Sequence, residues 1–301
     1  MSSTLKAHLA LFSANLIYAL NYGIAKDVMG EDYVDPFAFI LFRVVGAILL
    51  FWAVWLTSKR EKIEKKDYLR FVWCGVFGVA ANQLMFFEGL HLTNEINASI
   101  IMTVNPIMVL IMAAFIVKER LTSQKLMGIL LGIAGAVYLI LSKEKSAKEA
   151  SILGDVLIFM NAAAYGLYLI IVMPLMKKYS PFTVAKWSFT LGFIFVLPFG
   201  LSQLGDVNWN MPTDIILKIA FVIVFTTFFA YILNISALKH VSPTVVSAYI
   251  YLQPLLTSVI ALFRETDSIT LPKVISAILI FTGVYLVSVK TPLLISPKER
   301  N

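Results

Sequence analysis

The fold of this chain is decided by residues 36–57, which read PFAFILFRVVGAILLFWAVWLT. The run holds one charged residue, Arg43, among apolar and small side chains. A helix needs about 20 predominantly apolar residues to cross the hydrocarbon core of a bilayer. The stretch is therefore predicted to be a membrane-spanning helix.

The composition of the whole chain agrees with this prediction. Of the 301 residues, 59% are hydrophobic and only 14% are charged, whereas about a quarter of the residues in a soluble protein are charged. A soluble globule of this size could not cover so much apolar surface with polar groups. The net charge of +7 is spread between the apolar runs, which argues against a nucleic-acid-binding face. The single cysteine, Cys74, excludes an internal disulfide and a Cys-rich metal site.

Nine further runs resemble 36–57, so an all-α membrane protein with ten transmembrane helices is expected. The expected spans are 7–28, 36–57, 69–90, 96–117, 123–141, 152–176, 181–202, 214–238, 243–263 and 270–290. Transmembrane β-strands are excluded because the runs are continuous and do not alternate between apolar and polar residues. Most lysines and arginines fall in the loops on one side if the N-terminus is cytoplasmic. The positive-inside rule therefore places both termini in the cytoplasm of a multi-pass inner-membrane protein.

An internal repeat is visible at a constant offset of 148 residues. Asn105-Pro106 in the fourth span lies over Gln253-Pro254 in the ninth, and the same offset places Gly135 over Gly283. Each half then holds five spans, with boundaries at about 5–142 and 150–290. Because five is odd, the second half enters the membrane from the opposite side. Inverted repeats are typical of secondary transporters, whose substrate sites lie near mid-membrane between the halves.

Polar side chains inside the spans are the candidate binding residues, because an amide in hydrocarbon needs a bonding partner. They are predicted to face a shared cavity or one another. The alternative is that these residues only hold helices together. The predicted substrate-binding residues are Asn15, Tyr18, Arg43, Asn82, Asn105, Asn161, Tyr165, Asn234, Tyr249 and Gln253. Pro106 and Pro254 are predicted to be paired hinges, since proline removes one helix hydrogen bond and kinks the helix.

Two of the charged residues within the expected spans are candidates for a functional role. Arg43 is the more informative, since a guanidinium at that depth must meet an anion, backbone carbonyls or an aromatic face. It is interpreted either as a ligand for a substrate carboxylate or phosphate, or as a structural residue bonded to helix ends and nearby acids. Glu88, about one turn from the outer end of the third span, is expected to reach the outer surface.

Several motifs together resemble the drug/metabolite transporter superfamily, and specifically its EamA type. The resemblance covers nearly the whole chain in two copies. It is strongest in Asn97-Ala98-Ser99-Ile100-Ile101, Asn105-Pro106, Glu119-Arg120-Leu121-Thr122, Gln124, Gly128, Gly132 and Gly135, with Phe42-Arg43 and Asn82-Gln83 as further matches. The second copy departs from the pattern, with Arg264-Glu265-Thr266-Asp267 in place of the E-R-L-T turn and Ser188 in place of the arginine.

The resemblance implies a ten-helix inverted-repeat fold with a central cavity, commonly lined by spans one, three, four, six, eight and nine. It further implies export or exchange of amino acids or related small metabolites by alternating access. Neither a catalytic residue, a metal site nor a cofactor is expected, because the zinc and phosphate-binding motifs are absent. The expected partners are a small-molecule substrate and the lipid bilayer, not nucleic acid, and the protein is expected to be a monomer or a homodimer. Two other readings stay open at this point: a membrane scaffold or sensor that transports nothing, and a channel.

Overall fold

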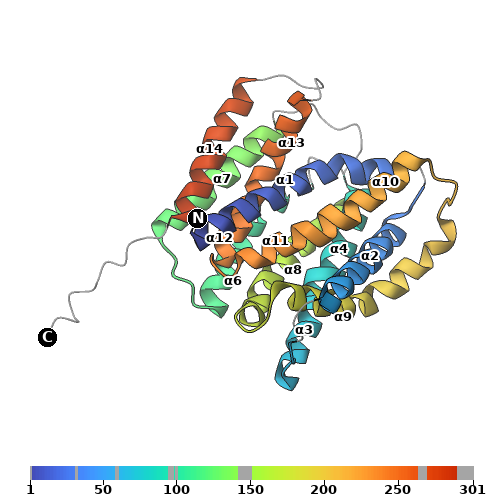
Figure 1. Ribbon diagram of the computed structural model, residues 1–301. Coiled ribbons are helices and arrows are strands. Elements are labelled where there is room, and N and C mark those ends of the chain that lie inside the picture. The colour runs from blue at the N-terminus through green and yellow to red at the C-terminus, as the bar shows by residue number, and fades with distance from the viewer. Residues whose placement is uncertain are drawn as a thin grey trace.

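The computed structural model describes residues 2–30, 33–57, 61–93, 98, 101–141, 151–263 and 270–289, and these are helical with short connections (Figure 1). The helices of the first half are α1 (Ser3–Gly30), α2 (Pro36–Thr57), α3 (Tyr68–Gly75), α4 (Ala81–Leu92), α6 (Asn105–Ile116) and α7 (Ser123–Leu141). Those of the second half are α8 (Ile152–Met176), α9 (Pro181–Ser202), α10 (Thr213–Phe221), α11 (Ala230–Ala237), α12 (Pro243–Ala248), α13 (Leu252–Phe263) and α14 (Leu271–Ser288).

The all-α membrane fold expected from the sequence is confirmed. Within the described residues, seven helices are long and apolar enough to cross a membrane, and two shorter apolar helices cover Asn105–Ile116 and Ser123–Leu139. The helix α1 is not among the seven although it is 28 residues long, because polar residues such as Asn15 and Asn21 lower its hydropathy. The count of ten crossings stays a prediction. The expected limits of the two halves at 142, 150 and 290 lie outside the described residues.

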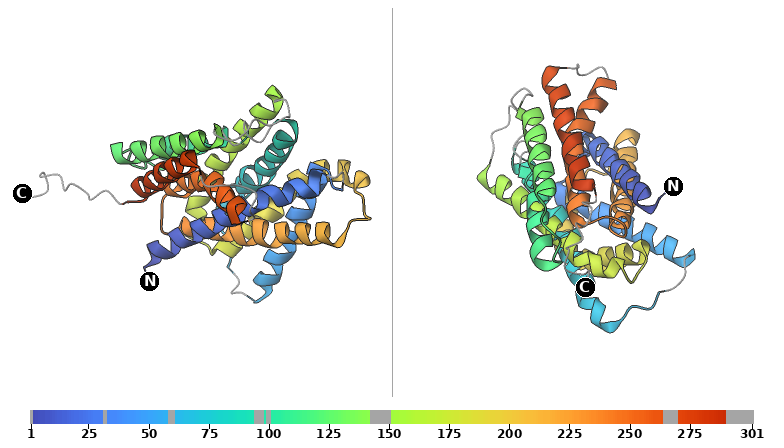
Figure 2. Two further views of the ribbon diagram at one scale, coloured as in Figure 1. Left: turned by 90° about the horizontal axis from the view of Figure 1, so that it is seen from above. Right: turned by 90° about the vertical axis from the view of Figure 1, so that its left-hand side faces the viewer.

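The contacts between the two halves follow the internal repeat. Equivalent spans of the two halves lie side by side: α2 with α9, α7 with α14, and the fourth span with the ninth, through contact of α6 with α12 (Figures 1 and 2). The two remaining pairs are α1 with α11 and α4 with α8. The repeat makes α1 equivalent to α8 and α11 equivalent to α4, so these two contacts are equivalent to each other. These contacts are those of two copies related by a two-fold axis, as in transporters with inverted repeats.

Within the described ranges four spans are interrupted, in two equivalent pairs. The third span changes to a π-helix at Val76–Ala80, and the eighth changes to one at Val222–Phe229. The fourth span has a turn at residues 103–104 just before Pro106, and the ninth has a 3-10 turn at Tyr249–Tyr251 just before Pro254. Proline explains the second pair, because it lacks an N–H and its ring clashes with the carbonyl four residues earlier. Wide π-turns inside α-helices are frequent at functional sites.

The interruption in the fourth span is stabilised by the ninth. The Tyr251 hydroxyl donates a hydrogen bond of 3.2 Å to the carbonyl oxygen of Thr103. The two residues are 148 positions apart, so they occupy equivalent places in the two halves. In a bilayer core a freed carbonyl must be bonded inside the protein, and Tyr251, which is 1% exposed, meets that need.

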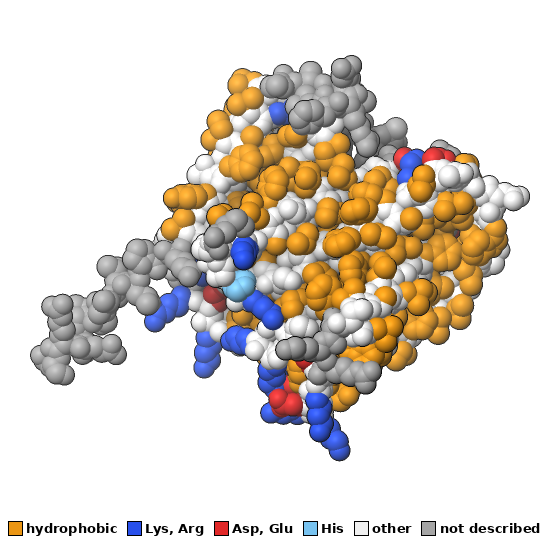
Figure 3. Space-filling model, in the orientation of Figure 1, with side chains coloured by type: hydrophobic (Ala, Val, Ile, Leu, Met, Phe, Trp, Pro, Cys, Tyr) orange, Lys and Arg blue, Asp and Glu red, His pale blue; other side chains and the backbone are white. Residues whose placement is uncertain are grey.

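The surface of the molecule is divided into an apolar belt and two charged ends (Figure 3). Large apolar side chains such as Leu49, Phe115 and Tyr285 are exposed along the belt, as is expected of a surface that contacts lipid. Charged side chains bond one another at the ends. Lys178 lies 2.8 Å from Asp67 at one end, and Lys218 lies 2.9 Å from Asp27 at the other.

Close packing of α7 against α14 depends on Gly283. A Cβ atom at this position would lie 2.6 Å from the carbonyl oxygen of Gly128 and 2.7 Å from the amide nitrogen of Gly132. Both are backbone atoms that cannot move aside. We expect Gly283→Ala to lower the free energy of unfolding in detergent by about 1–3 kcal/mol, as overpacking does.

The matched control is Gly23→Ala in α1, where a Cβ atom would meet nothing within 4 Å. Alanine favours the helix over glycine by roughly 0.5–1 kcal/mol, so this variant should be as stable as the parent or more stable. Equal effects of the two substitutions on the unfolding curve would contradict the packing described here.

Replacement of Tyr251 by phenylalanine removes only the hydroxyl that bonds Thr103. We expect Tyr251→Phe to cost about 0.5–2 kcal/mol, the range for hydrogen bonds in proteins and between membrane helices. Tyr285→Phe is the control, because Tyr285 is 66% exposed on the apolar belt. Thermal unfolding of both variants in the same detergent gives the comparison.

Candidate functional site

A cavity of about 160 Å³ lies between the two halves. Its walls come from α1, α2, α4, α8, α9, α11, α12 and α13, from both π-helical turns, from the 3-10 turn at Tyr249–Tyr251, and from Met102 of the fourth span. A cavity of about 150 Å³ is large enough to hold benzene. The sequence-based expectation for the lining helices included spans one, three, four, six, eight and nine; Arg43 of α2 and Phe189 of α9 add the second and seventh.

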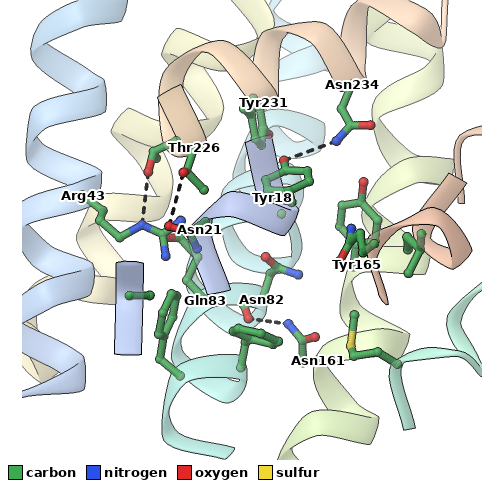
Figure 4. A pocket seen from close by; sticks show the side chains of 18 of the residues that line it. Tyr18, Asn21, Arg43, Asn82, Gln83, Asn161, Tyr165, Thr226, Tyr231 and Asn234 are labelled. Carbon is green, nitrogen blue, oxygen red and sulfur yellow. Dashed lines mark hydrogen bonds between the residues drawn. The ribbon is translucent and has the colours of Figure 1, made fainter. Parts of the chain in front are cut away.

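The cavity brings together eight of the ten residues that the sequence singled out. They are Asn15, Tyr18, Arg43, Asn82, Asn161, Tyr165, Asn234 and Gln253. Figure 4 shows how most of them lie: Tyr18 of α1 is in the middle of the view, Arg43 at one side, and Asn161 and Tyr165 of α8 at the other. The common lining is therefore polar and aromatic, and its side chains come from both halves.

Side-chain amides form hydrogen bonds between the helices of the cavity wall, and these bonds occur at equivalent places in the two halves. Gln253 Nε2 donates to Asn15 Oδ1 at 2.9 Å, which joins the ninth span to the first. In the other half, Asn105 Nδ2 donates to the carbonyl oxygen of Ala162 at 2.6 Å, which joins the fourth span to the sixth. Asn105 and Gln253 are repeat mates, so the two bonds hold equivalent helix pairs.

Two further amides connect the third span with the sixth and the eighth with the first. Asn161 Nδ2 donates to the carbonyl oxygen of Asn82. Asn234 Nδ2 donates to the Tyr18 hydroxyl at 3.2 Å (Figure 4). The Oδ1 atom of Asn161, by contrast, is buried and has no hydrogen-bond partner within the described residues. The wall therefore satisfies its amide N–H groups better than its acceptor oxygens.

Arg43 is the cation of the cavity. Its Nε donates to Thr227 Oγ1 at 3.1 Å, and its Cζ atom lies 4.7 Å from the ring centre of Phe87. Thr227 belongs to the π-helical turn of the eighth span, and its own hydroxyl donates to the carbonyl oxygen of Val222, five residues earlier. The wide turn thus presents a hydroxyl that orients the guanidinium.

Two predicted binding residues lie outside the cavity lining. Asn105 is fully buried behind the wall, with its amide bonded to α8. Tyr249 turns toward the start of α1, where its hydroxyl lies 2.8 Å from His8 Nδ1 and the two rings stack with centres 5.9 Å apart. The 3-10 turn at Tyr249–Tyr251 is the reason, because its three residues per turn rotate Tyr249 away from the face of Gln253. Pro106 and Pro254 also lie outside the lining.

The structure adds lining residues that were not predicted from the sequence. The polar ones are Asn21, Gln83, Thr226, Thr227 and Tyr231. Thr226 Oγ1 donates to Asn21 Oδ1 at 3.2 Å. Asn21 was visible as a polar residue within the first span, and Gln83 as part of the family pattern. Threonine is common in membrane helices, so Thr226 and Thr227 gave no signal in the sequence. The π-helical turn places both of them in the cavity lining.

The part of the chain that the structure describes holds no group of three or more His, Cys, Asp or Glu side chains able to bind a metal ion. Cys74 is buried away from the cavity lining.

Comparisons with known proteins extend over the whole chain. An "Uncharacterized transporter" of Archaeoglobus fulgidus is 29% identical over 95% of this chain and 98% of its own length. "Uncharacterized transporter YyaM" of Bacillus subtilis is 24% identical over 93% and 92%. A WAT1-related protein of Arabidopsis thaliana is 25% identical over 90% of this chain and 79% of its own.

A crystal structure of another protein has the same fold, with a TM-score of 0.77 over 93% of this chain and 95% of that one at 18% identity. The family model of the EamA-like transporters matches twice, at residues 5–141 and 152–289. Both matches contribute helices to the cavity, and named transporters share the full length. The chain belongs to the EamA-like transporter family and is a membrane transporter.

Proposed function

We propose that this transporter exports or exchanges small organic metabolites across the cytoplasmic membrane by alternating access. The observation that carries the proposal is the cavity itself. It lies between two halves of opposite orientation, and interrupted helices from both halves form or flank its wall. In inverted-repeat transporters the substrate site lies at this place, and one half rocks against the other around it.

The predicted units, 5–142 and 150–290, are taken as the two moving parts. The turns before Pro106 and Pro254 supply the flexible points, since neither span forms a continuous α-helix there. The contact between His8 and Tyr249 lies about two helical turns from Asn15 along α1. It supports a state in which the cavity is closed toward the end of the molecule where α1 begins.

That end is proposed to face the cytoplasm. The start of α1 and the end of α14 lie at the same end of the molecule (Figure 1). The blue lysine and arginine side chains in Figure 3 gather at this end. Excess positive charge on cytoplasmic loops is the rule for membrane proteins, so the arrangement supports cytoplasmic ends for α1 and α14.

The function is tested by comparing all small metabolites retained and released by cells with and without the protein. We expect a defined set of organic compounds to shift from the cells to the medium. Asn82→Trp fills the cavity and should abolish the shift, while Ile278→Trp on the lipid-facing surface of α14 should not. A scaffold or sensor would give no shift, or one that Asn82→Trp leaves intact; a channel would give flux without saturation or counterflow.

Access to the cavity is tested with single cysteines in a Cys74→Ala background. A membrane-impermeant, water-soluble thiol reagent should label Gln253→Cys, because Gln253 lines the cavity. Ile278→Cys, exposed to lipid, should not react, because the reagent does not enter hydrocarbon. If the cysteine at 253 reacts from neither side of the membrane, the proposed alternating access is contradicted.

A further inference from the structure

The starting observation is the charge balance of the cavity. Arg43 is a formal cation that is 7% exposed. No aspartate or glutamate is among the described residues that line the cavity, and none of the ion pairs found in the described ranges includes Arg43. A charge in a low-dielectric site needs a partner of opposite sign. Among the described lining residues there is no such partner.

The hydrogen bonds of Arg43 are also incomplete. A guanidinium has five N–H donors in a planar fork, and its Nε uses one of them on Thr227. The NH1 atom is buried and has no partner within the described residues. The fork is shaped to bind the two oxygens of a carboxylate. The unpaired end of the Arg43 guanidinium is buried and held in a fixed orientation, so it can bind an oxyanion.

A second buried cation of the same protein shows how the fold treats a charge that needs no ligand. The ammonium of Lys186 in α9 lies 4.4 Å from the ring centre of Trp52, 3.9 Å from that of Trp55 and 5.2 Å from that of Trp187. Three indole faces, the best aromatic partners for a cation, enclose it outside the cavity. Within the described residues, Arg43 faces only the phenyl rings of Phe87 and Phe39, which are weaker partners, at 4.7 and 5.8 Å.

The remainder of the cavity indicates the body of the ligand. Phe86, Tyr165 and Tyr231 supply aromatic walls. Gln83 Oε1 and Asn161 Oδ1 are buried acceptors without a donor in the described part of the chain. Asn161 lies across the cavity from Arg43 (Figure 4). These features match a compact, partly apolar body with a hydrogen-bond donor at some distance from its charged group.

We propose that the cavity binds small organic monocarboxylates, with the carboxylate held by Arg43 and the body of the solute packed among the aromatic side chains. One guanidinium balances one negative charge. A phosphate monoester carries nearly two at neutral pH and would leave the second unbalanced. The inference rests on the proposed function, because the bound monocarboxylate is taken to be the transported solute.

The test uses three probes of nearly equal shape and different charge: benzoate, benzamide and benzylamine. Their binding to the full-length protein in detergent is measured by calorimetry and by the shift in Tm at neutral pH and constant ionic strength. We expect benzoate to bind and to raise Tm, and the neutral and cationic probes to bind at least tenfold more weakly. Phenyl phosphate, with its larger charge, should also bind more weakly than benzoate.

Arg43→Gln should weaken benzoate binding by roughly 10- to 100-fold, the loss that corresponds to a hydrogen bond with a charged group. It should weaken benzamide binding much less than benzoate binding, because benzamide carries no charge for Arg43 to balance. Arg120→Gln is the matched control, because Arg120 is exposed outside the cavity. If Arg43→Gln does not fold, Thr227→Val serves instead: it removes the hydroxyl that orients the guanidinium and should weaken benzoate selectively by several-fold.

The proposal is overturned if benzamide or benzylamine binds as tightly as benzoate. It is equally overturned if the Arg43 and Thr227 variants bind benzoate like the parent, or if benzoate, acetate and phenylacetate all fail to bind at millimolar concentration. The metabolite comparison tests the proposed function independently of the binding experiment. Neutral or cationic compounds in the metabolite comparison would contradict the monocarboxylate site alone, whereas carboxylate binding with no metabolite shift would contradict transport alone.

Discussion

A polar group in the hydrocarbon core of a bilayer has no water to bond with, and this constraint shapes the interior of the protein. Polar groups at the interruptions in the fourth and ninth spans find partners across the boundary between the halves. Tyr251 bonds the freed carbonyl of Thr103, and Gln253 bonds Asn15. Among the buried side-chain atoms without a partner in the described residues, those of Arg43, Gln83 and Asn161 lie on the cavity wall, whereas those of Ser188 and Ser276 do not. The requirement that buried polar groups be bonded thus holds the helices together where partners are present, and leaves groups available to a ligand on the cavity wall.

The same requirement governs charge. Lys186 and Arg43 are both buried, yet only Lys186 is enclosed by three indole rings. Arg43 is oriented by a hydroxyl from a π-helical turn and keeps part of its fork unbonded. An interior that leaves a cation uncompensated is destabilised by it. Retaining such a residue is understandable where a ligand supplies the missing charge during part of the transport cycle.

Much of the fold could be predicted from the sequence, because apolar runs and a constant offset are properties of the chain itself. Helix ends such as those of α2 and α9 agree with the expected limits. The side-chain directions around the interruptions could not be predicted. Assigning residues to a helix face assumes a regular rotation per residue, and a 3-10 or π-helical turn changes that rotation. Three 3-10 residues turn Tyr249 toward His8, and a π-helical turn brings Thr226 and Thr227 inward. Asn105 has the expected depth but is bonded behind the wall.

The bond between Tyr251 and Thr103 has a consequence for ancestry. Positions that are equivalent in the two halves and also touch must lie on the symmetry axis that relates them. In an assembly of two identical half-length chains, both sides of such a contact would carry the same residue, so a tyrosine would face a tyrosine. The unlike pair seen here is closed to such a homodimer and requires two copies that differ in sequence, as the two halves of this single chain do.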